Sequence, residues 1–497
     1  MKNKVTLLNI LSSIGMQLIS IVSALIVPRL ILETFGSNVN GLVSSITQFL
    51  NYITLIEGGI TGVIAANLYR PLVEKDEQKL SSVLSAARSF YRKIGAIFVG
   101  YSVIVGIIYP MFVNTGYDDF YVFVLTIVLS MGLMLEYMFS LTYTTLLNAD
   151  KKIYLVSIIS SIITIINIIL TIIVVENFPD IILLKLANAI LFALKPLAYG
   201  IYVKKYYKID WNVRKDNNLI EQRWNGFAIN LAFFIHMSTD VTLLTIFSDL
   251  KSVSVYSIYY LIISKISIIV NAITSSIEPA IGQAYAKKNE EQLNEKLDLY
   301  EFIVIMTVGW GFLVTGLLLT PFVMLYTTGI TDTNYYQPVF GAVLVLAEAV
   351  YLLRTPHVSL AYSANKFKEV TLPAYVEAII NIGVSIFLIH RIGLVGIAVG
   401  TLAGMLYRGA FHIYFTSKLV PARKQRIYYR KLLVLIVTVI FCYLVCTKLF
   451  PFNSYSIEAW IIHAMIYGAS CICIFAVVGF IFFKKEVIYL IKYLKRR

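Results

Sequence analysis

Long runs of apolar residues dominate the sequence, and they constrain the fold more than any other feature. Each run is about 20 residues long, the length of an α-helix that crosses the hydrocarbon core of a bilayer. Apolar residues make up 58% of the chain and charged residues only 14%. Because a bilayer offers no water to hydrogen-bond the backbone, such segments fold as helices. The sequence therefore predicts an all-α polytopic membrane protein.

We predict about fourteen transmembrane helices from the positions of these runs. Charged segments and segments that contain Gly or Pro separate them. The predicted spans are 5–27, 40–67, 94–113, 120–147, 153–175, 181–203, 225–247, 254–280, 300–325, 337–363, 369–389, 393–416, 431–450 and 456–483. The first span lacks the small-residue cleavage site of a secretory signal peptide, so we expect it to be retained.

The connections between these spans alternate in charge. If the N-terminus is cytoplasmic, most of the 42 Lys and Arg residues fall in inner segments, and the outer connections hold only Arg29, Lys251, Arg391 and Lys448. Cytoplasmic loops of membrane proteins carry such an excess of basic residues. We therefore expect a protein of the cytoplasmic membrane with both termini inside. The net charge of +14 then suits the anionic inner leaflet rather than nucleic acid.

An internal repeat relates the two halves of the chain. The segment IEGGITGVIAANLYRPLVEKDEQKL begins at Ile56, and the similar segment IEPAIGQAYAKKNEEQL begins at Ile277; a chance match is the alternative. A repeat offset by six spans keeps its orientation in the membrane, as in transporters built from parallel repeats. We therefore predict two pseudo-symmetric six-helix lobes with the substrate passing between them. The predicted regions are an N-lobe at 1–205, a cytoplasmic linker at 206–224, a C-lobe at 225–416, and two further helices with a basic cytoplasmic tail at 417–497.

Polar residues form stripes along several spans. In span 254–280, polar side chains from Ser257 to Glu278 recur every three or four residues, and spans 5–27 and 40–67 show similar stripes. Small polar residues let membrane helices pack closely, whereas Asn, Gln and Glu in one stripe also suit a hydrated cavity. The candidate substrate-binding residues are the polar Gln48, Asn51 and Asn271 and the cationic Arg29, Lys265 and Arg354.

Ionisable residues inside the spans are candidates for ion coupling. A charge at the bilayer centre costs roughly 3 kcal/mol or more, so such a residue usually faces a cavity or a partner. His236 and Asp240 lie one helical turn apart, which fits either a proton-sensitive pair or a buried His satisfied by its neighbour. Protons or Na⁺ are the expected coupling ions. The candidates are Glu57, His236, Asp240, Glu278 and Glu348.

Glycine and proline mark candidate hinges. Gly58 and Gly59 follow Glu57, Pro279 follows Glu278, and Pro28 lies near the end of the first span. Helices bend or pack closely at such residues. A buried carboxylate beside a hinge could therefore combine ion binding with a conformational change.

Two charged residues of the predicted C-lobe receive other interpretations. Glu377 shares a helical face with Asn381 and Ser385, which predicts a polar surface inside the bundle. Arg408 lies near the end of its span, where its long side chain could simply extend toward the membrane interface.

The region after the first span carries a family signature. In VPRLILETFGSNVNGLVSSITQFLNY (27–52), Pro28 near the helix end is followed by an apolar turn, by Gly36, and by the pair Gly41 and Leu42 that opens the next helix. This pattern resembles the first loop of polysaccharide repeat-unit flippases. Similar features occur in STDVTLLTIFSDLKSVSVYSIYYLI (238–262) and GLVGIAVGT (393–401). Over its whole length the chain resembles the polysaccharide transport branch of the multidrug/oligosaccharidyl-lipid/polysaccharide (MOP) exporter superfamily.

The resemblance implies two six-helix lobes around a central cavity, alternating access and no ATPase activity. It implies a flippase that moves undecaprenyl-pyrophosphate-linked oligosaccharides from the inner to the outer leaflet for capsule, O-antigen or exopolysaccharide synthesis. A polysaccharide polymerase and other assembly proteins are the implied protein partners. Relatives often have cationic cavities, whereas the matching helices here carry carboxylates at least as prominently, and no motif assigns a pyrophosphate ligand.

Two other classes of protein remain as alternatives. A cation-coupled small-molecule or drug exporter of the same superfamily would share the fold. A membrane enzyme that transfers or polymerises lipid-linked sugars would need a large outer catalytic loop, but the predicted outer connections are short. The sequence has no GxxxxGK[ST], HExxH or nucleophile-elbow motif, and its four cysteines lack metal-ligand spacing. We therefore expect no enzymatic activity, metal or cofactor.

Overall fold

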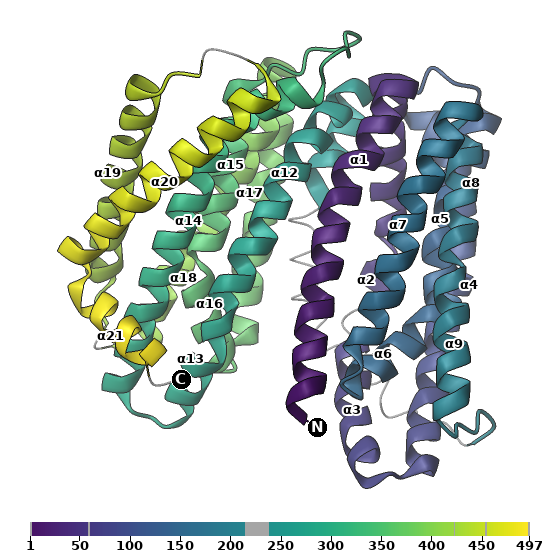
Figure 1. Cartoon of the computed structure of the whole chain (residues 1–497), viewed down its shortest axis with the longest axis horizontal. Helices are drawn as coiled ribbons and strands as arrows, with labels where there is room; N and C mark the ends of the chain where they lie inside the picture. Colours follow the sequence, from purple (N-terminus) through teal and green to yellow (C-terminus); the bar gives the residue numbers. More distant parts are fainter. Residues whose placement is uncertain (1, 58–59, 214–237, 422, 453–454, 496–497) are drawn as a thin grey trace. The chain divides into compact units, whose positions relative to one another are not determined.

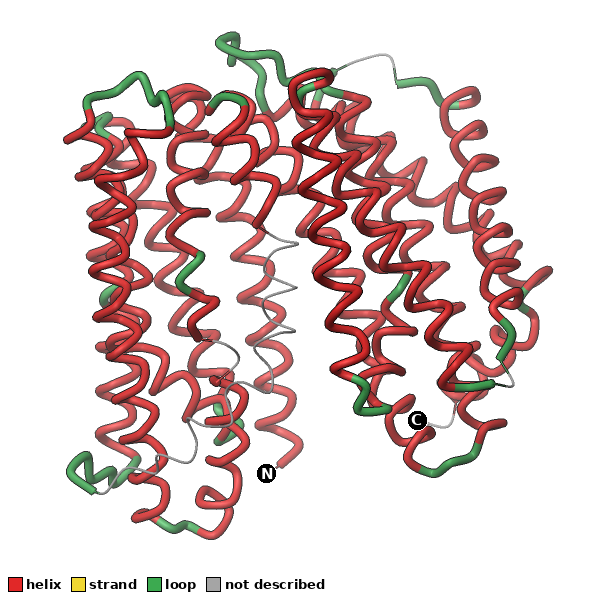
Figure 2. The backbone as a smooth tube through the Cα atoms, turned by 180° about the vertical axis from the view of Figure 1, so that it is seen from behind, coloured by secondary structure: helices red, strands yellow, loops and turns green. Residues whose placement is uncertain are grey.

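The computed structural model describes residues 2–57, 60–213, 238–421, 423–452 and 455–495. Within these residues every regular element is a helix and no strand occurs (Figure 2). The chain divides into two compact units, Met1–Ser254 and Val255–Arg497. The all-α prediction is confirmed. The predicted linker at 206–224 lies mostly outside the described residues, so the predicted lobe boundaries stay a prediction.

The first unit is a bundle in which α1 runs beside α7 (Figure 1), and α5 contacts both α4 and α8. A short helix at Ser238–Phe247 also belongs to this unit. Its other elements are α1 (Lys2–Asn51), α2 (Thr54–Glu57), α3 (Ile60–Glu74), α4 (Glu77–Phe112), α5 (Asp119–Leu135), a π-helix (Glu136–Ser140), α6 (Leu141–Ala149), α7 (Ile153–Asn177), α8 (Ile181–Phe192) and α9 (Leu194–Tyr206).

The second unit contains the remaining helices, and α12 begins in the last residues of the first unit. Within it, α17 packs closely against α18, and α14 contacts α15, α19 and α20 (Figure 1). Its elements are α12 (Leu250–Thr274), a 3-10 turn (Ser275–Ile277), α13 (Glu278–Ala286), α14 (Glu290–Tyr326), α15 (Pro338–Leu353), α16 (Thr355–Ser363), α17 (Phe367–Ile392), α18 (Leu394–Leu419), α19 (Gln425–Leu449), α20 (Ile457–Phe482) and α21 (Lys484–Lys495).

Twelve helical segments of the described chain are long and apolar enough to cross a membrane. The first of them, Lys4–Asn51, contains span 5–27 and the beginning of span 40–67, and its backbone departs from helical geometry at Gly36, where φ is 79°. The predicted span 225–247 is described only from Ser238 onward. If Lys4–Asn51 is counted as two spans, and the short helix Ser238–Phe247 as part of one further span, the structure agrees with about fourteen spans.

The predicted span 40–67 is not one continuous helix. Helix α1 ends at Asn51, and α2 and α3 follow as separate pieces. The Thr54 hydroxyl donates to the Asn51 carbonyl at 2.8 Å and so satisfies a carbonyl at the end of α1. This break places Glu57 at the end of a short helix.

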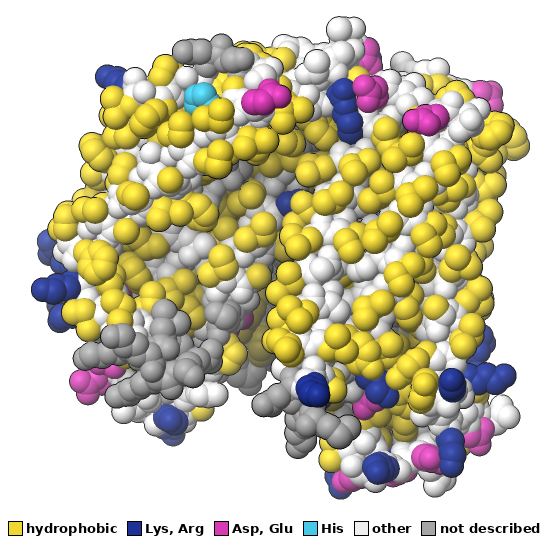
Figure 3. Space-filling model, in the orientation of Figure 1, with side chains coloured by type: hydrophobic (Ala, Val, Ile, Leu, Met, Phe, Trp, Pro, Cys, Tyr) yellow, Lys and Arg dark blue, Asp and Glu magenta, His cyan; other side chains and the backbone are white. Residues whose placement is uncertain are grey.

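The surface of each unit has the character of a membrane protein. Hydrophobic side chains cover the flanks of the helices, whereas Lys, Arg, Asp and Glu gather near the helix ends (Figure 3). Large apolar side chains such as Ile104 on α4 and Leu433 on α19 are exposed. In water such surfaces would be unfavourable, so the flanks are suited to lipid. Together with the twelve apolar helices, this surface indicates a multi-pass membrane protein.

The two units repeat the same local turns, which supports the predicted internal repeat. Lys75 and Lys288 both adopt positive φ, at 56° and 53°. Each is followed by an N-cap residue: Asp76 accepts from the backbone N–H of Lys79 at 2.8 Å, and Asn289 accepts from that of Gln292 at 2.9 Å. The long helices α4 and α14 then begin. At this turn the two units are therefore similar in backbone as well as in sequence.

Helices α17 and α18 meet along a line of glycines. Gly396, Gly400 and Gly404 lie one turn apart on α18, and a Cβ at Gly400 would lie only 2.7 Å from the Asn381 carbonyl oxygen. Small residues at such spacing allow membrane helices to approach closely. This approach brings the polar face of α17, which carries Glu377, against α18.

We expect Gly400→Val to destabilise the protein by about 1–3 kcal/mol or more, because the added side chain would force the two helices apart. The midpoint of thermal unfolding in detergent measures the effect. Gly383→Val is the matched control, because a Cβ at Gly383 on α17 has no atom within 4 Å. Equal midpoints for the two variants would contradict this account of the α17–α18 contact.

Candidate functional site

Glu57 lies in a network of hydroxyl groups in the first unit. The Thr61 hydroxyl donates to Glu57 Oε1, and the Tyr137 phenol donates to Glu57 Oε2 at 3.2 Å. Thr61 Oγ1 is also 2.7 Å from the Tyr91 phenol. Tyr91 and Tyr137 are buried, and Glu57 is half-buried. The carboxylate is therefore held by side chains from α3 and the π-helix, and α4 supports them.

A second carboxylate lies close to Glu57. Glu136 opens the π-helix and interacts electrostatically with both Glu57 and Lys195. The ammonium of Lys195 lies 4.5 Å from the centre of the Phe192 ring. Short π-helices frequently occur at functional sites. The first unit thus gathers two carboxylates and one cation inside its predicted spans, an arrangement that can exchange a proton or hold a small cation.

The corresponding carboxylate of the second unit has a similar partner. The Tyr300 phenol on α14 donates to Glu278 Oε1 at 3.2 Å. Glu57 and Glu278, the carboxylates of the internal repeat, therefore each accept a hydrogen bond from a tyrosine of another helix. Their environments differ, since Glu278 is exposed in its unit whereas Glu57 is half-buried.

Two arginines share one carboxylate in the core of the second unit. Arg408 Nη1 lies 2.5 Å from Glu377 Oε2, and Arg354 Nη1 lies 3.4 Å from the same oxygen. All three side chains are buried. The interpretation of Arg408 as a residue that extends to the interface is wrong, because the close α17–α18 contact gives it a buried anionic partner. Arg354, a candidate for substrate binding, is the more weakly paired of the two.

Removing Arg408 should therefore destabilise the protein more than removing Arg354. A buried carboxylate that loses its partner typically costs about 3–5 kcal/mol. We expect Arg408→Gln to lose only part of that amount, because Glu377 keeps the longer contact with Arg354, and Arg354→Gln to lose less still, because it keeps the shorter contact with Arg408. Thermal unfolding midpoints in detergent compare the variants, and a larger loss for Arg354→Gln would contradict the assignment.

The other candidate substrate-binding residues lie in separate places. Arg29 pairs with Glu33 one turn along α1, at 3.1 Å. Gln48 and Asn51 lie half-buried near the end of α1, Lys265 is half-buried on α12, and Asn271 is exposed on the same helix. Within neither unit do these contacts define a single ligand-binding cluster among the described residues.

The remaining ion-coupling candidates are placed as follows. Ser267 Oγ donates to Glu348 Oε2 at 3.3 Å, and both Glu348 and Asp240 are buried. His236 lies outside the described residues, so the proposed pair with Asp240 stays a prediction.

The candidate hinges are also only partly described. Pro28 lies inside α1, whose backbone breaks later, at Gly36. Pro279 opens α13 directly after the 3-10 turn, whereas Gly58 and Gly59 lie outside the described residues.

Sequence reasoning missed the tyrosines that hold the carboxylates. Tyr137 lies 80 residues from Glu57 in the chain, and its phenol reaches the carboxylate only through tertiary packing. Tyrosines of membrane proteins are typically interface residues, so the residue type alone does not point to such a contact. The sequence does show that a later span than that of Glu57 contains a tyrosine. It does not show that this tyrosine and Glu57 form a hydrogen bond.

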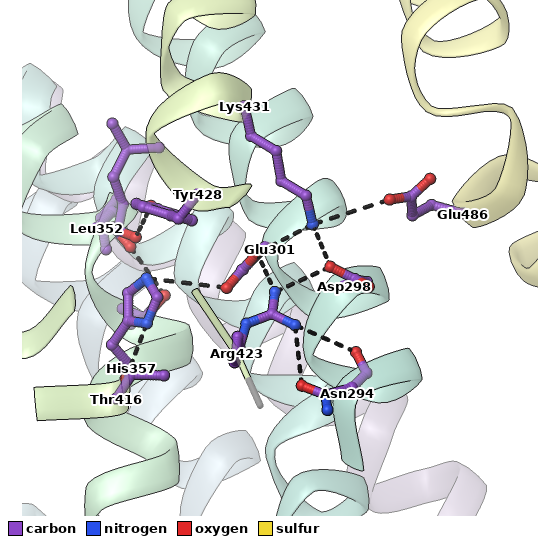
Figure 4. A network of polar contacts seen from close by, with 12 residues as sticks. Asn294, Asp298, Glu301, Leu352, His357, Thr416, Arg423, Tyr428, Lys431 and Glu486 are labelled. Atoms are coloured by element: carbon purple, nitrogen blue, oxygen red, sulfur yellow. Dashed lines mark hydrogen bonds and ion pairs between the residues drawn. The ribbon is translucent and has the colours of Figure 1, made fainter. Parts of the chain in front are cut away.

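An ionic network joins α14, α19 and α21 in the second unit (Figure 4). Arg423 Nη2 lies 2.6 Å from Glu301 Oε2 and 2.9 Å from Asp298 Oδ1. Lys431 Nζ lies 3.0 Å and 2.6 Å from the same two atoms, and 3.8 Å from Glu486 on α21. Each cation contacts both carboxylates of α14. We interpret this network as a structural clamp at one end of the helices rather than as a substrate site.

Solved structures resemble most of the chain. The lipid II flippase MurJ in an inward closed conformation superposes with a TM-score of 0.72 at 16% sequence identity, covering 96% of this chain and 100% of MurJ. An inward-facing multidrug resistance MATE family transporter of the MOP superfamily gives a TM-score of 0.62 at 13% identity, covering 81% of this chain and 96% of its own. The MATE multidrug transporter DinF-BH, solved as a complex, gives a TM-score of 0.60 at 16% identity, covering 84% of this chain and 96% of its own.

No family model and no curated protein sequence matches the chain. The structural likenesses establish the fold, which is the transporter fold of MurJ and the MATE proteins. The predicted MATE-like architecture is therefore confirmed.

Proposed function

We propose that this protein is a flippase that carries polyprenyl-pyrophosphate-linked oligosaccharide repeat units from the inner to the outer leaflet of the cytoplasmic membrane. The observation that carries the proposal is the match to MurJ, which covers nearly all of both chains. The MATE transporters match less of this chain and superpose with lower TM-scores. Both termini are assigned to the cytoplasm from the distribution of Lys and Arg.

The physical requirements of this activity fit the chain. A pyrophosphate-sugar head group cannot cross hydrocarbon unaided, because desolvating charges and hydroxyls is costly. Guanidinium and ammonium groups suit a diphosphate, and Arg29 of the first unit and Lys265 of the second are separate candidates; the polar stripes would hydrogen-bond the sugar. The polyprenyl tail would stay in lipid. The translocated repeat units would be used for capsule, O-antigen or exopolysaccharide synthesis, and a polymerase would act after the flippase.

Coupling to an ion gives the direction of transport. Alternation between inward and outward states requires a ligand that binds one state better than the other. We assign this role to a proton or Na⁺ bound at Glu57, because its carboxylate is held by hydroxyl donors beside a second carboxylate. Glu278, with its own tyrosine partner, is the corresponding candidate in the second unit.

Deletion of the gene in its native host tests the proposal. We expect surface polysaccharide to be lost and lipid-linked repeat units to accumulate on the inner leaflet, with both restored by the wild-type gene. Unchanged polysaccharide together with increased sensitivity to cationic drugs would contradict the proposal and favour a MATE-type exporter.

A further inference from the structure

A cavity of about 640 Å³ lies in the second unit between α14, α15, α18 and α19. Small residues on three of these helices, Gly316, Ala349 and Gly409, contribute to its lining. Leu406 and Ile440, which also line it, are each 54% exposed, so the cavity opens on the apolar flank of the unit. In a bilayer, its opening faces hydrocarbon.

Arg354 is the only charged residue among the described residues that line this cavity. Its side chain is 6% exposed, and a charge in hydrocarbon is expensive without a partner. The partner of Arg354 is Glu377, whose Oε2 lies 3.4 Å from Arg354 Nη1. The same oxygen lies closer to Arg408 Nη1, at 2.5 Å. One carboxylate cannot neutralise two guanidinium groups. The cavity wall therefore carries excess positive charge at Arg354.

Among the described residues, Glu377 is the carboxylate that pairs with Arg354, whereas buried Glu348 interacts electrostatically with the neighbouring Tyr351. Its guanidinium lies 4.6 Å from the centre of the Tyr351 ring, a neutral partner. His412 on α18 lies close enough to interact electrostatically with both arginines, and its ring nitrogens lack hydrogen-bond partners among the described residues. An imidazole is neutral or cationic, so it adds no negative charge. Tyr428 donates its phenol to the Leu353 carbonyl at 2.6 Å.

The cavity is charged at one end, and the rest of its lining is mainly apolar. Its lining follows α19 from Tyr428 to Tyr443, about 22 Å at 1.5 Å per residue. One leaflet contributes about 15 Å to the hydrocarbon core, so a single lipid chain fits along this length. Arg354 lies at the Tyr428 end of the cavity, because the Tyr428 phenol donates a hydrogen bond to the carbonyl of Leu353, the residue before Arg354. The exposed Arg426 and Arg430 add positive charge at the same end of α19, which we predict to be cytoplasmic.

We propose that this cavity binds an anionic phospholipid of the inner leaflet, with one hydrocarbon chain along α19 and the phosphate at Arg354. The head group supplies the negative charge that Glu377 cannot supply to both arginines. A charge-assisted hydrogen bond to the phosphate gives selectivity for anionic over zwitterionic lipid. The proposal does not depend on which substrate the protein transports.

Native mass spectrometry of the delipidated, full-length protein tests this site with phosphatidylglycerol and phosphatidylethanolamine as probes. We expect the wild type to bind phosphatidylglycerol roughly tenfold more tightly. Arg354→Gln should remove most of this preference, and Arg354→Lys should retain much of it. Arg391→Gln is the charge-matched control, because Arg391 is exposed in the last turn of α17 and does not line the cavity.

A second variant tests the apolar part of the cavity. A Cβ at Gly409 meets only Val350, at 3.9 Å, so Gly409→Leu should place its side chain in the cavity and weaken binding of both lipids. Gly383→Leu, at an open position on α17, should leave binding unchanged. Arg354→Lys and Gly409→Leu carry the test if Arg354→Gln does not fold.

Three results would overturn the proposal. The first is full lipid selectivity in Arg354→Gln, and the second is an equal loss in Arg391→Gln. The third is displacement of phosphatidylglycerol by equimolar polyprenyl phosphate, which would assign the cavity to a different lipid.

Discussion

Glu57→Gln should lower the rate of lipid-linked oligosaccharide translocation roughly 100-fold, near the upper end of typical coupling energies. The glutamine keeps the size of the side chain and can still accept from Thr61 or Tyr137. It cannot exchange a proton, and it offers a cation only a neutral oxygen. The loss should therefore appear in ion-driven transport while folding is retained. Transport into the outer leaflet under an imposed proton or Na⁺ gradient measures the effect.

The partners and an exposed control sharpen this prediction. Tyr137→Phe removes one donor to Glu57 and should give an intermediate rate, because Thr61 still holds the other carboxylate oxygen. Glu176→Gln removes a charge from an exposed position at the end of α7 and should transport as the wild type does. Wild-type rates for Glu57→Gln under the same gradient would refute the assignment of ion coupling to this carboxylate.

Glu301→Gln should destabilise the second unit by roughly 3–5 kcal/mol, because it removes a buried carboxylate that two cations contact. Glu301 is 0% exposed, and its Oε2 lies 2.6 Å from Arg423 and 3.0 Å from Lys431 (Figure 4). With the charge removed, only Asp298 and the more distant Glu486 remain to balance both cations. The clamp between α14 and α19 would then loosen.

Thermal unfolding in detergent tests this second prediction. Glu291→Gln is the matched control, because Glu291 is exposed in the first turn of the same helix. We expect its midpoint to equal that of the wild type and the midpoint of Glu301→Gln to fall clearly below both. Similar midpoints for the two variants would mean that the network contributes little to stability.

The helical fold follows from local sequence properties. A run of apolar residues long enough to cross a bilayer has almost no alternative to a helix, so the number and positions of the spans could be predicted. The exception is span 40–67. There α1 ends at Asn51, where the Thr54 hydroxyl donates to the Asn51 carbonyl, and hydropathy does not encode such a local hydrogen bond.

The candidate sites were only partly predictable, for a physical reason. Glu57 could be selected because a carboxylate inside an apolar run demands an explanation. Its tyrosine partner could not, because that contact depends on packing between distant segments. The same holds for Arg408, whose burial depends on the contact at Gly404. A Cβ there would lie 3.0 Å from the Glu377 carbonyl oxygen.

The most direct test of the central claim is translocation by the purified protein. Proteoliposomes would carry a polyprenyl-pyrophosphate-linked oligosaccharide, and a membrane-impermeant glycosidase would report how much glycan reaches the opposite leaflet. We predict protein-dependent translocation that requires the lipid-linked substrate and a proton or Na⁺ gradient, and that is lost in Glu57→Gln. Absence of translocation by protein that instead exports a free cationic dye under the same gradient would contradict the flippase assignment.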